Sequence, residues 1–175
     1  GLLSSSTVQL TVETDEDATC RYSDNDLDYD DMGSEMDYLG EGYHEAIVTL
    51  EDGTYTFYFK CKDLAGNVNE DTVSTTFEVD TIPPEIIYVV LDDNAVKGGD
   101  SIGVIVKTDD TATSVTADGF TLTSASTTWT GTITAEADEG TYSVTVEACD
   151  LAGNCVIDES SAYIVDNTAP EAPEL

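Results

Sequence analysis

Apolar residues alternate with polar ones along most of this chain. Clear examples are Val8, Leu10 and Val12, then Tyr55, Phe57, Phe59 and Cys61, then Ile102, Val104 and Val106. A period of two residues predicts β-strands that bury one face. No stretch longer than a turn shows the spacing of an amphipathic helix. The pattern therefore predicts an all-β protein, with strands of about 7 to 10 residues separated by Gly, Asn and Asp.

The chain contains an internal duplication. Asp63-Leu64-Ala65-Gly66-Asn67 recurs as Asp150-Leu151-Ala152-Gly153-Asn154, and Gly53-Thr54-Tyr55 recurs as Gly140-Thr141-Tyr142, both 87 residues later. Nearer the start, Thr14-Asp15 matches Thr108-Asp109, 94 residues later. The first copy therefore carries about seven extra residues, which we place in the acidic loop from Asp24 to Glu41. The duplication predicts two units, residues 1–82 and residues 83–175.

Each unit is predicted to be an antiparallel β-sandwich of the immunoglobulin type. Tyr55 and Tyr142 each open a long strand two residues after a glycine, where a tyrosine corner bonds its hydroxyl to the backbone. The predicted fold class is all-β, with two tandem antiparallel Ig-like sandwiches joined by a short linker containing Pro83 and Pro84. Residues 1–6 leave the first strand of unit 1 short or incomplete, whereas residues 86–91 supply it in unit 2. The other predicted strands are residues 7–14, 18–23, 44–50, 54–62 and 72–79 in unit 1, and 101–108, 113–118, 128–135, 141–149 and 156–165 in unit 2.

Several motifs carry a resemblance to a known class of repeats. They are Ala18-Thr19-Cys20-Arg21-Tyr22-Ser23, the Gly-Thr-Tyr corner, the Cys-Lys-Asp-Leu-Ala-Gly-Asn loop and the exit Val79-Asp80-Thr81-Ile82-Pro83-Pro84. Together they resemble the tandem Ig-like or fibronectin III-like repeats of prokaryotic, especially archaeal, cell-surface proteins. The resemblance covers nearly all of both units and implies an extracellular stalk, adhesin, sheath or filament component without catalysis. The second unit departs from it, since Ser114 stands where the first has Cys20.

The chain is strongly acidic, with 37 Asp and Glu residues, 5 Lys and Arg residues and a formal net charge of −32. Both units share this charge. It excludes binding to nucleic acid or to an anionic membrane surface and makes cations the expected partners. We interpret it as a halophilic adaptation to high salt, which screens repulsion, combined with some calcium binding. No apolar run reaches the roughly 20 residues of a spanning helix, so no membrane insertion is expected.

The four cysteines are predicted to form two disulfides, which indicates an extracellular compartment. Cys20 and Cys61 share the inward faces of two strands, so we pair them within one sheet. Cys149 has outward parity and lies six residues before Cys155, so we pair these two across a hairpin. On the entropy model the first bond contributes about 3 to 4 kcal/mol, and the second mainly rigidifies its loop.

Calcium is the predicted cofactor, bound at one end of each sandwich. In this topology the loop after the second strand, the last hairpin and the entry of the first strand lie together, and carboxylates there would repel one another without a hard cation. The predicted ligands at the junction of the units are Asp80, Asp109, Asp110, Asp150 and Asn154. Those at the equivalent end of unit 1 are Asp15, Asp17, Asp63 and Asn67. The alternative is that Asp-Leu-Ala-Gly-Asn is a turn in which Asp and Asn cap the backbone.

Two further features have a structural interpretation that we favour. The carboxylates of Asp24, Asp26, Asp28, Asp30 and Glu35 have a spacing near that of an EF-hand. Tyr29 occupies the position of the required glycine, however, and a solvated acidic loop is expected. The single histidine, His44, begins a strand and is expected to face solvent. No nucleophile motif accompanies it, and the chain is predicted not to be an enzyme.

A carbohydrate-binding β-sandwich module is the alternative to a purely structural role. Its candidate stacking rings are Trp129, Tyr29, Tyr38, Tyr43 and Tyr58. Trp129 shares a face with Ile133, however, and is expected to lie in the core.

The sequence thus predicts a non-catalytic structural module of an extracellular surface protein, rigidified by calcium and disulfides. Such a module would serve as an adhesin stalk, sheath or filament subunit. The expected partners are neighbouring repeats or identical subunits, joined by strand addition at the incomplete first strand of unit 1, and a cell-surface glycan or protein.

Overall fold

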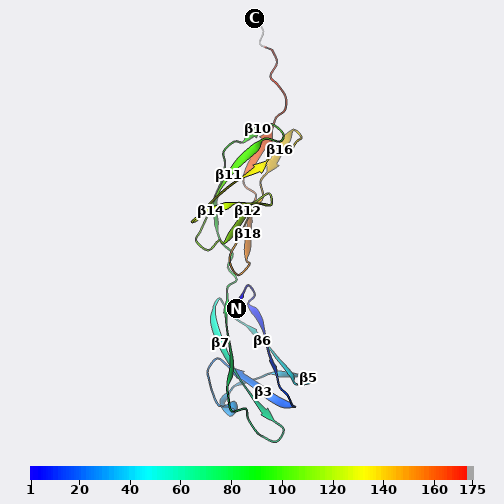
Figure 1. The fold of residues 1–175 in the computed structure, drawn as a ribbon, viewed down its shortest axis with the longest axis vertical. Helices are drawn as coiled ribbons and strands as arrows, with labels where there is room; N and C mark the ends of the chain where they lie inside the picture. Colours follow the sequence, from blue (N-terminus) through cyan, green and yellow to red (C-terminus); the bar gives the residue numbers. More distant parts are fainter. Residues whose placement is uncertain (173–175) are drawn as a thin grey trace. The chain divides into compact units, whose positions relative to one another are not determined.

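The computed structural model describes residues 1–172, and the chain divides into two compact units, Gly1–Thr81 and Ile82–Leu175 (Figure 1). The boundary predicted after residue 82 differs from this division by one residue. Both units are built mainly of antiparallel strands, and the described residues contain no α-helix. The predicted all-β class with Ig-like sandwiches is confirmed.

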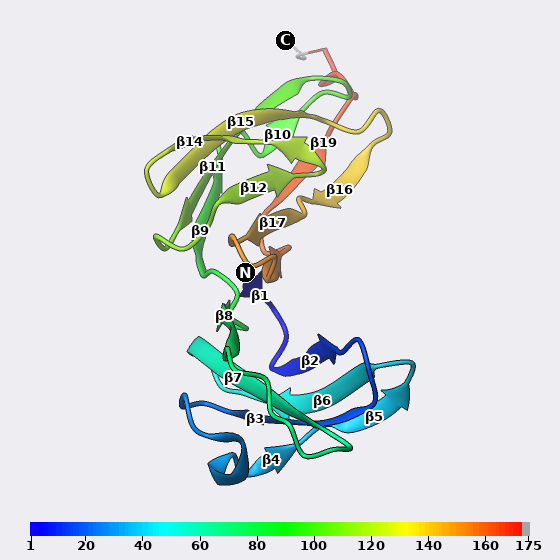
Figure 2. The same ribbon diagram turned by 60° about the horizontal axis from the view of Figure 1, so that its bottom comes forward.

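Unit 1 combines a five-stranded sheet, order β1-β8-β7-β3-β4, with a three-stranded sheet, order β2-β6-β5 (Figure 2). The strands are β1 Leu2–Leu3, β2 Thr7–Glu13, β3 Ala18–Ser23, β4 Ser34–Glu35, β5 Asp37–Gly40, β6 Tyr43–Thr49, β7 Gly53–Asp63 and β8 Val73–Val79. The five strands predicted from alternation correspond to β2, β3, β6, β7 and β8. Each observed end lies within one residue of the predicted end.

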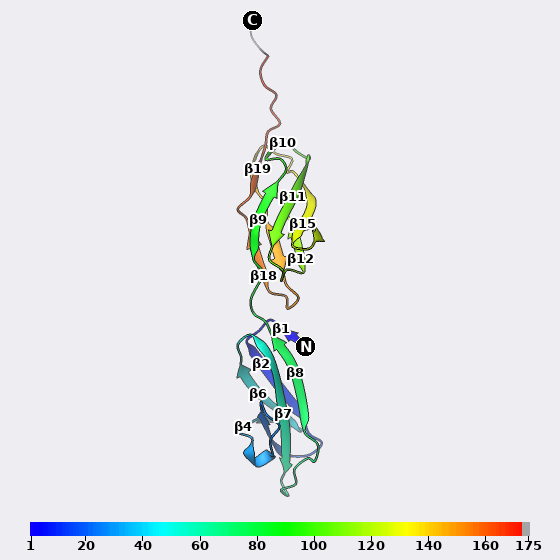
Figure 3. The same ribbon diagram turned by 90° about the vertical axis from the view of Figure 1, so that its left-hand side faces the viewer.

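Unit 2 has two four-stranded sheets, orders β14-β15-β11-β9 and β13-β12-β17-β18, and a three-stranded sheet, order β10-β19-β16. Figure 3 shows β9, β11 and β15 side by side. The strands are β9 Ile86–Leu91, β10 Ala95–Val96, β11 Ser101–Thr108, β12 Ser114–Ala117, β13 Phe120–Thr121, β14 Thr123–Ala125, β15 Thr128–Thr134, β16 Gly140–Ser143, β17 Val146–Cys149, β18 Cys155–Asp158 and β19 Ala162–Val165.

The last two predicted strands of unit 2 are each divided in two. The break between β16 and β17 contains Thr145, whose backbone N–H donates to the Asp118 carboxylate at 2.8 Å. The break between β18 and β19 contains Ser160, whose N–H donates to the Asp158 carboxylate at 3.0 Å. At both breaks a side-chain carboxylate therefore accepts a backbone N–H group.

The predicted tyrosine corners are present in both units. The Tyr55 hydroxyl donates to the carbonyl of Glu51, and the Tyr142 hydroxyl donates to the carbonyl of Asp138, each at 3.0 Å. Both hydroxyls reach back four residues, so each corner fixes the turn that leads into the next strand, β7 in unit 1 and β16 in unit 2.

The first strand is where the two units differ most in topology. In unit 2, β9 pairs antiparallel with β11 in one sheet, and the following β10 pairs parallel with β19 in another. Unit 1 has the second of these pairings, since β1 runs parallel to β8. Within residues 1–172 it has no counterpart of β9 beside β2.

Each unit has its own hydrophobic core. Unit 2 buries fifteen hydrophobic residues in one cluster, mostly Val, Ile and Ala from β11, β12, β15, β17 and β19, together with Trp129. Unit 1 buries nine in its main cluster, among them Phe57, Phe59 and Phe77. The rings of Phe57 and Phe77 lie with their centroids 6.0 Å apart. Alternating side chains of the facing sheets thus form both cores, as the sequence pattern predicts.

The extra acidic segment of unit 1 is folded, which corrects the expectation of a solvated loop. It contains a short 3₁₀ turn, Tyr29–Asp31, followed by β4 and β5. Tyr29, Met32 and Met36 are all buried. These three side chains anchor the segment to the sandwich, and its carboxylates are left at the surface.

Candidate functional site

Two disulfides brace the two units in different ways. Cys20 on β3 is bonded to Cys61 on β7, directly across one antiparallel ladder, with Cα atoms 4.0 Å apart. Cys149 at the end of β17 is bonded to Cys155 at the start of β18, with Cα atoms 4.2 Å apart. Both pairings agree with those predicted from face parity. The first closes a 41-residue loop within unit 1, and the second closes a 6-residue hairpin in unit 2.

The two Asp-Leu-Ala-Gly-Asn segments form the same capped hairpin loop. In unit 2 the Asp150 carboxylate accepts hydrogen bonds from the backbone N–H groups of Gly153 and Asn154, and from the Asn154 side chain at 2.9 Å. In unit 1 the Asp63 carboxylate accepts from the backbone and the side chain of Asn67, both at 2.8 Å. The carboxylates therefore act as turn caps, as the alternative to calcium binding predicts.

Both capping carboxylates titrate below their ordinary range. The hydrogen bonds from Asn67 lower the pKa of Asp63. Burial raises the pKa of Asp150, but the hydrogen bonds from Asn154 and Gly153 outweigh it and leave that pKa lowered. Each Asp is thus held as the anion that its N–H donors require.

Within each unit, the described carboxylates of the predicted calcium ligands do not form a cluster. Asp109 accepts hydrogen bonds from Thr111, and its side chain forms no group with Asp110 and Asp150 whose oxygens all lie within 4.8 Å. The same holds for Asp15, Asp17 and Asp63 in unit 1. Asp17 instead accepts from the Tyr38 hydroxyl at 2.6 Å, and Asp80 belongs to unit 1 while the rest of its predicted set belongs to unit 2.

Among residues 1–172, one group of three side chains has the proximity of a metal site: Glu147, Cys149 and Cys155. The two cysteines form the unit 2 disulfide and therefore do not offer thiolates. Calcium binding stays a prediction.

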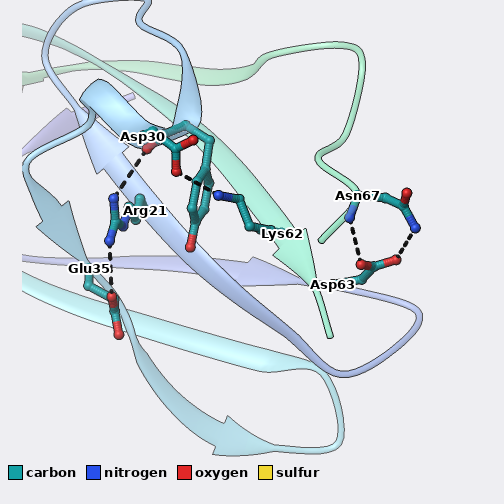
Figure 4. A network of polar contacts seen from close by, with 7 residues as sticks. Arg21, Asp30, Glu35, Lys62, Asp63 and Asn67 are labelled. Atoms are coloured by element: carbon teal, nitrogen blue, oxygen red, sulfur yellow. Dashed lines mark hydrogen bonds and ion pairs between the residues drawn. The ribbon is translucent and has the colours of Figure 1, made fainter. Parts of the chain in front are cut away.

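The three lysine and arginine residues of unit 1 all pair with the acidic segment, and Figure 4 shows the pairs of Arg21 with Glu35 and of Lys62 with Asp30. Arg21 on β3 lies 3.7 Å from Glu35, and on β7 Lys60 lies 3.6 Å from Asp28 and Lys62 lies 2.5 Å from Asp30. The Arg21 guanidinium and the Lys62 ammonium also lie over the Tyr29 ring, at 4.8 and 4.3 Å from its centroid. The hydrogen bond and the charge of Lys62 lower the pKa of Asp30. A cationic patch on the sheet therefore holds the acidic segment in place.

This pairing separates the carboxylates that have EF-hand spacing. Asp28, Asp30 and Glu35 each face a different basic residue, and the Asp26 carboxylate accepts from Thr72 at 2.9 Å. The segment is thus a folded, ion-paired insertion of unit 1.

His44 is buried, which corrects the expectation that it faces solvent. Its side chain is 1% exposed, and its Nε2 lies 3.3 Å from the Thr14 hydroxyl. The Nδ1 atom is buried and has no hydrogen-bond partner among the described residues, and burial lowers the pKa of His44. The ring packs beside Tyr38 on β5, with centroids 5.1 Å apart. His44 has the inward parity of Ala46 on β6, and the inserted strand β5 places Tyr38 against its ring.

In unit 2, Trp129 holds the position that His44 holds in unit 1. Its Nε1 donates to the Thr108 hydroxyl at 3.0 Å, and Thr108 is the duplicate of Thr14. The indole is 6% exposed, which confirms its expected core position. Tyr29 is equally buried, so neither ring offers a face to a sugar. Tyr38 and Tyr43 are about half exposed, at 48% and 49%.

No protein-family model and no curated protein matches this sequence. Among solved structures, the fibronectin(III)-like modules of CbhA from Clostridium thermocellum match with a TM-score of 0.56 at 15% identity, over 99% of this chain and 93% of that chain. The fold is that of fibronectin III-like and Ig-like modules.

Two further solved structures match with lower TM-scores. SGBP-B of the Bacteroides ovatus mixed-linkage glucan utilization locus, in complex with a heptasaccharide, has a TM-score of 0.31 at 16% identity, over 95% of this chain and 42% of that chain. An ICAM-5 ectodomain fragment has a TM-score of 0.42 at 18% identity, over 94% of this chain and 45% of that chain. Neither value bears on the function of this chain.

Proposed function

We propose that this chain is a non-catalytic structural module of an extracellular surface protein, such as a stalk, sheath or filament subunit. The observation that carries the proposal is the pair of disulfide-braced sandwiches in tandem. Disulfides persist in oxidising, extracellular compartments. A tandem of such modules provides length and rigidity, because each unit has its own core and its own covalent brace.

The surface charge supports an extracellular role in high salt. With a net charge of −32, the chain repels itself and other acidic surfaces in dilute buffer. Molar salt reduces the Debye length to about 3 Å and removes that repulsion. Packing of modules against one another is therefore expected to strengthen as salt is added.

Within residues 1–172, no helix has the length and apolar character needed to cross a membrane.

Labelling of intact cells tests the location. An antibody raised against residues 1–172 should label the surface of the producing cells without permeabilisation. Protease added outside the cells should remove the label, and an antibody to a cytoplasmic protein serves as the matched control. A signal that appears only after permeabilisation would overturn the proposal.

Single-molecule stretching tests the structural role. Oxidised unit 1 should release a chain about 140 Å shorter than reduced unit 1, because the disulfide retains 41 residues at roughly 3.5 Å each. In unit 2 the corresponding difference is about 20 Å, from 6 residues. Two discrete unfolding steps, one per unit, are expected. Extension without such steps would contradict a load-resisting module.

A further inference from the structure

The β17–β18 hairpin of unit 2 brings three metal-ligating side chains together on its outer face. Glu147 and Cys149 are two residues apart on β17, so both point away from the buried side of Val146 and Ala148. Cys155 on β18 lies directly across the ladder from Cys149. The two sulfurs and one carboxylate oxygen of Glu147 all lie within 4.8 Å of one another. The three side chains are therefore already gathered while the sulfurs are bonded to each other.

This group is specific to unit 2. The residues that stand 87 positions earlier, at the equivalent places in unit 1, are Lys60, Lys62 and Val68. Lys62 and Val68 form the same cross-strand bridge that Cys149 and Cys155 form in unit 2. Both lysines pair with carboxylates of the acidic segment. Unit 1 thus presents two cations on this face of the hairpin, whereas unit 2 presents a carboxylate and two sulfurs, which suit a cation from solution.

Other interactions hold this hairpin in shape besides the disulfide. The ladder between β17 and β18 continues beyond the cysteines to the pair of Val146 and Asp158. The Asp150 carboxylate caps the loop through the N–H groups of Gly153 and Asn154. The disulfide closes a loop of only 6 residues, and a short loop gives the smallest entropic contribution. We therefore expect the ladder to keep the three side chains together after the bond between the sulfurs is broken.

The two disulfides of the chain differ in their access to solvent. Cys155 is exposed, whereas Cys20 in unit 1 is fully buried, with an exposed fraction of 0%. Thiol–disulfide exchange begins when a thiolate attacks a sulfur that it can reach. A small thiol should therefore reduce the unit 2 disulfide first and leave that of unit 1 closed.

We propose that reduction of the Cys149–Cys155 disulfide opens a site for Zn²⁺, with the two cysteine thiolates and the Glu147 carboxylate as ligands. Two molecules of a small thiol supply two electrons and two protons. The bond between the Sγ atoms breaks, the small thiol becomes its own disulfide, and two cysteine thiols remain. As two bonds form between sulfur and the cation, the two thiol protons pass to water. Glu147 supplies the third ligand, and water takes the open fourth position of a tetrahedral site.

The ligand chemistry favours zinc over calcium. Thiolates are soft ligands that suit Zn²⁺, whereas Ca²⁺ takes six to eight oxygen ligands. The net charge of −32 raises the local concentration of either cation, so the selectivity comes from the sulfurs. In an oxidising compartment the disulfide closes the site, and binding requires reducing conditions. The proposed structural role does not depend on this site, and its tests are separate.

The test begins with selective reduction of the full chain by a small thiol, which is then removed without air. Alkylation and mass spectrometry should find labels on Cys149 and Cys155, with Cys20 and Cys61 unlabelled. Trp129 is the single tryptophan and lies in the core of unit 2, so its fluorescence reports whether that unit stays folded. We expect the emission of the reduced chain to match that of the oxidised chain.

Co²⁺ is the probe for the site, because its bonds to thiolates absorb in the near ultraviolet and tetrahedral coordination gives strong visible bands. The reduced chain should develop both signals and saturate at one equivalent of Co²⁺. Zn²⁺ should remove them, and excess Ca²⁺ should leave them unchanged. The oxidised chain should show neither signal, because carboxylates on the surface bind Co²⁺ without a thiolate bond.

Three variants assign the ligands. C149S/C155S should abolish the thiolate signal. Glu147→Gln should keep it but weaken Zn²⁺ binding at least about tenfold, since even loss of an outer-shell partner costs that much. Glu159→Gln is the matched control, because it removes the same charge from an exposed position of unit 2 outside the group and should leave the affinity unchanged.

Several results would overturn the proposal. One is a reduced, folded unit 2 that gives no thiolate signal with Co²⁺. Another is equal Zn²⁺ affinity of Glu147→Gln and Glu159→Gln, which would remove the carboxylate from the site. Loss of the folded Trp129 emission on reduction would also count against it, because the ladder would then not hold the ligands together. Labelling of Cys20 and Cys61 before the unit 2 pair would exclude selective opening of the site.

Discussion

The two units are copies of one sandwich, but different interactions stabilise them. Unit 2 has a complete first strand, fifteen buried residues in its core and a disulfide that closes a short hairpin. Among the described residues of unit 1, β2 pairs with β6 alone, the main cluster has nine buried residues, and the disulfide joins two neighbouring strands of one sheet. Where burial contributes less, a long-range covalent bond and an ion-paired insertion constrain the fold. The comparison indicates that unit 1 depends more on its covalent brace than unit 2 does.

Removal of the disulfides is expected to change the stability of the two units most. For C20A/C61A we expect unit 1 to lose about 4 kcal/mol of unfolding free energy, because its loop spans 41 residues. For C149A/C155A the 6-residue loop predicts a loss of about 2 kcal/mol from unit 2. Chemical denaturation, followed by a probe in each unit, measures both losses. Equal losses would show that loop length does not govern the difference.

The strands and the disulfides were predictable because both follow from parity. Alternation identifies the inward face of each strand, and that face decides which cysteines can meet. The capped loops were identified by position, but their bonds were not, because carboxylates at a loop suit a metal and a turn equally well. The burial of His44 depends on β5, whose short sequence Asp37–Gly40 carries no alternating pattern. Two signals were available: His44 has the parity of Ala46, and its strand aligns with the one that contains Trp129.

The Asp63 and Asp150 loops provide an intermediate test, because they are the same motif in two environments. Asp150→Ala removes an acceptor of three N–H groups at a buried position, and a loss of about 1 to 3 kcal/mol from unit 2 is expected. Asp63→Ala, at a more exposed site, should cost unit 1 less. Thermal melting of the wild type and of both variants, in chelator and in millimolar calcium, distinguishes a calcium-binding role of the loops from a backbone-capping role. A loss that grows in calcium would identify an ion site, and an unchanged loss would identify a backbone cap.

The smallest expected effect concerns His44 and Trp129, which occupy equivalent positions in the two units. His44 forms a hydrogen bond with Thr14, and Trp129 forms one with Thr108, the duplicate of Thr14. Burial lowers the pKa of His44, so the folded state favours the neutral ring. The stability that this provides is fully present above the ordinary histidine pKa of about 6.5 and is lost as the pH falls below it. Trp129 does not titrate, so unit 2 should show no such dependence in this range.

Denaturation at pH 7.5 and pH 5.5 measures this difference between the units. At pH 5.5 the unfolded chain is protonated at this histidine, and unit 1 should lose at most about 1.4 kcal/mol relative to pH 7.5. His44→Gln is the matched variant, because its amide retains a polar contact to Thr14 without a proton to gain. Its stability should change less between the two pH values than that of the wild type. The Tyr38 ring packs against His44, and its hydroxyl donates a hydrogen bond to Asp17. Asp17→Asn therefore checks whether the Asp17 carboxylate contributes to the pH dependence. An identical pH dependence in wild type and His44→Gln would assign the effect to the carboxylates of unit 1 and remove His44 from the comparison.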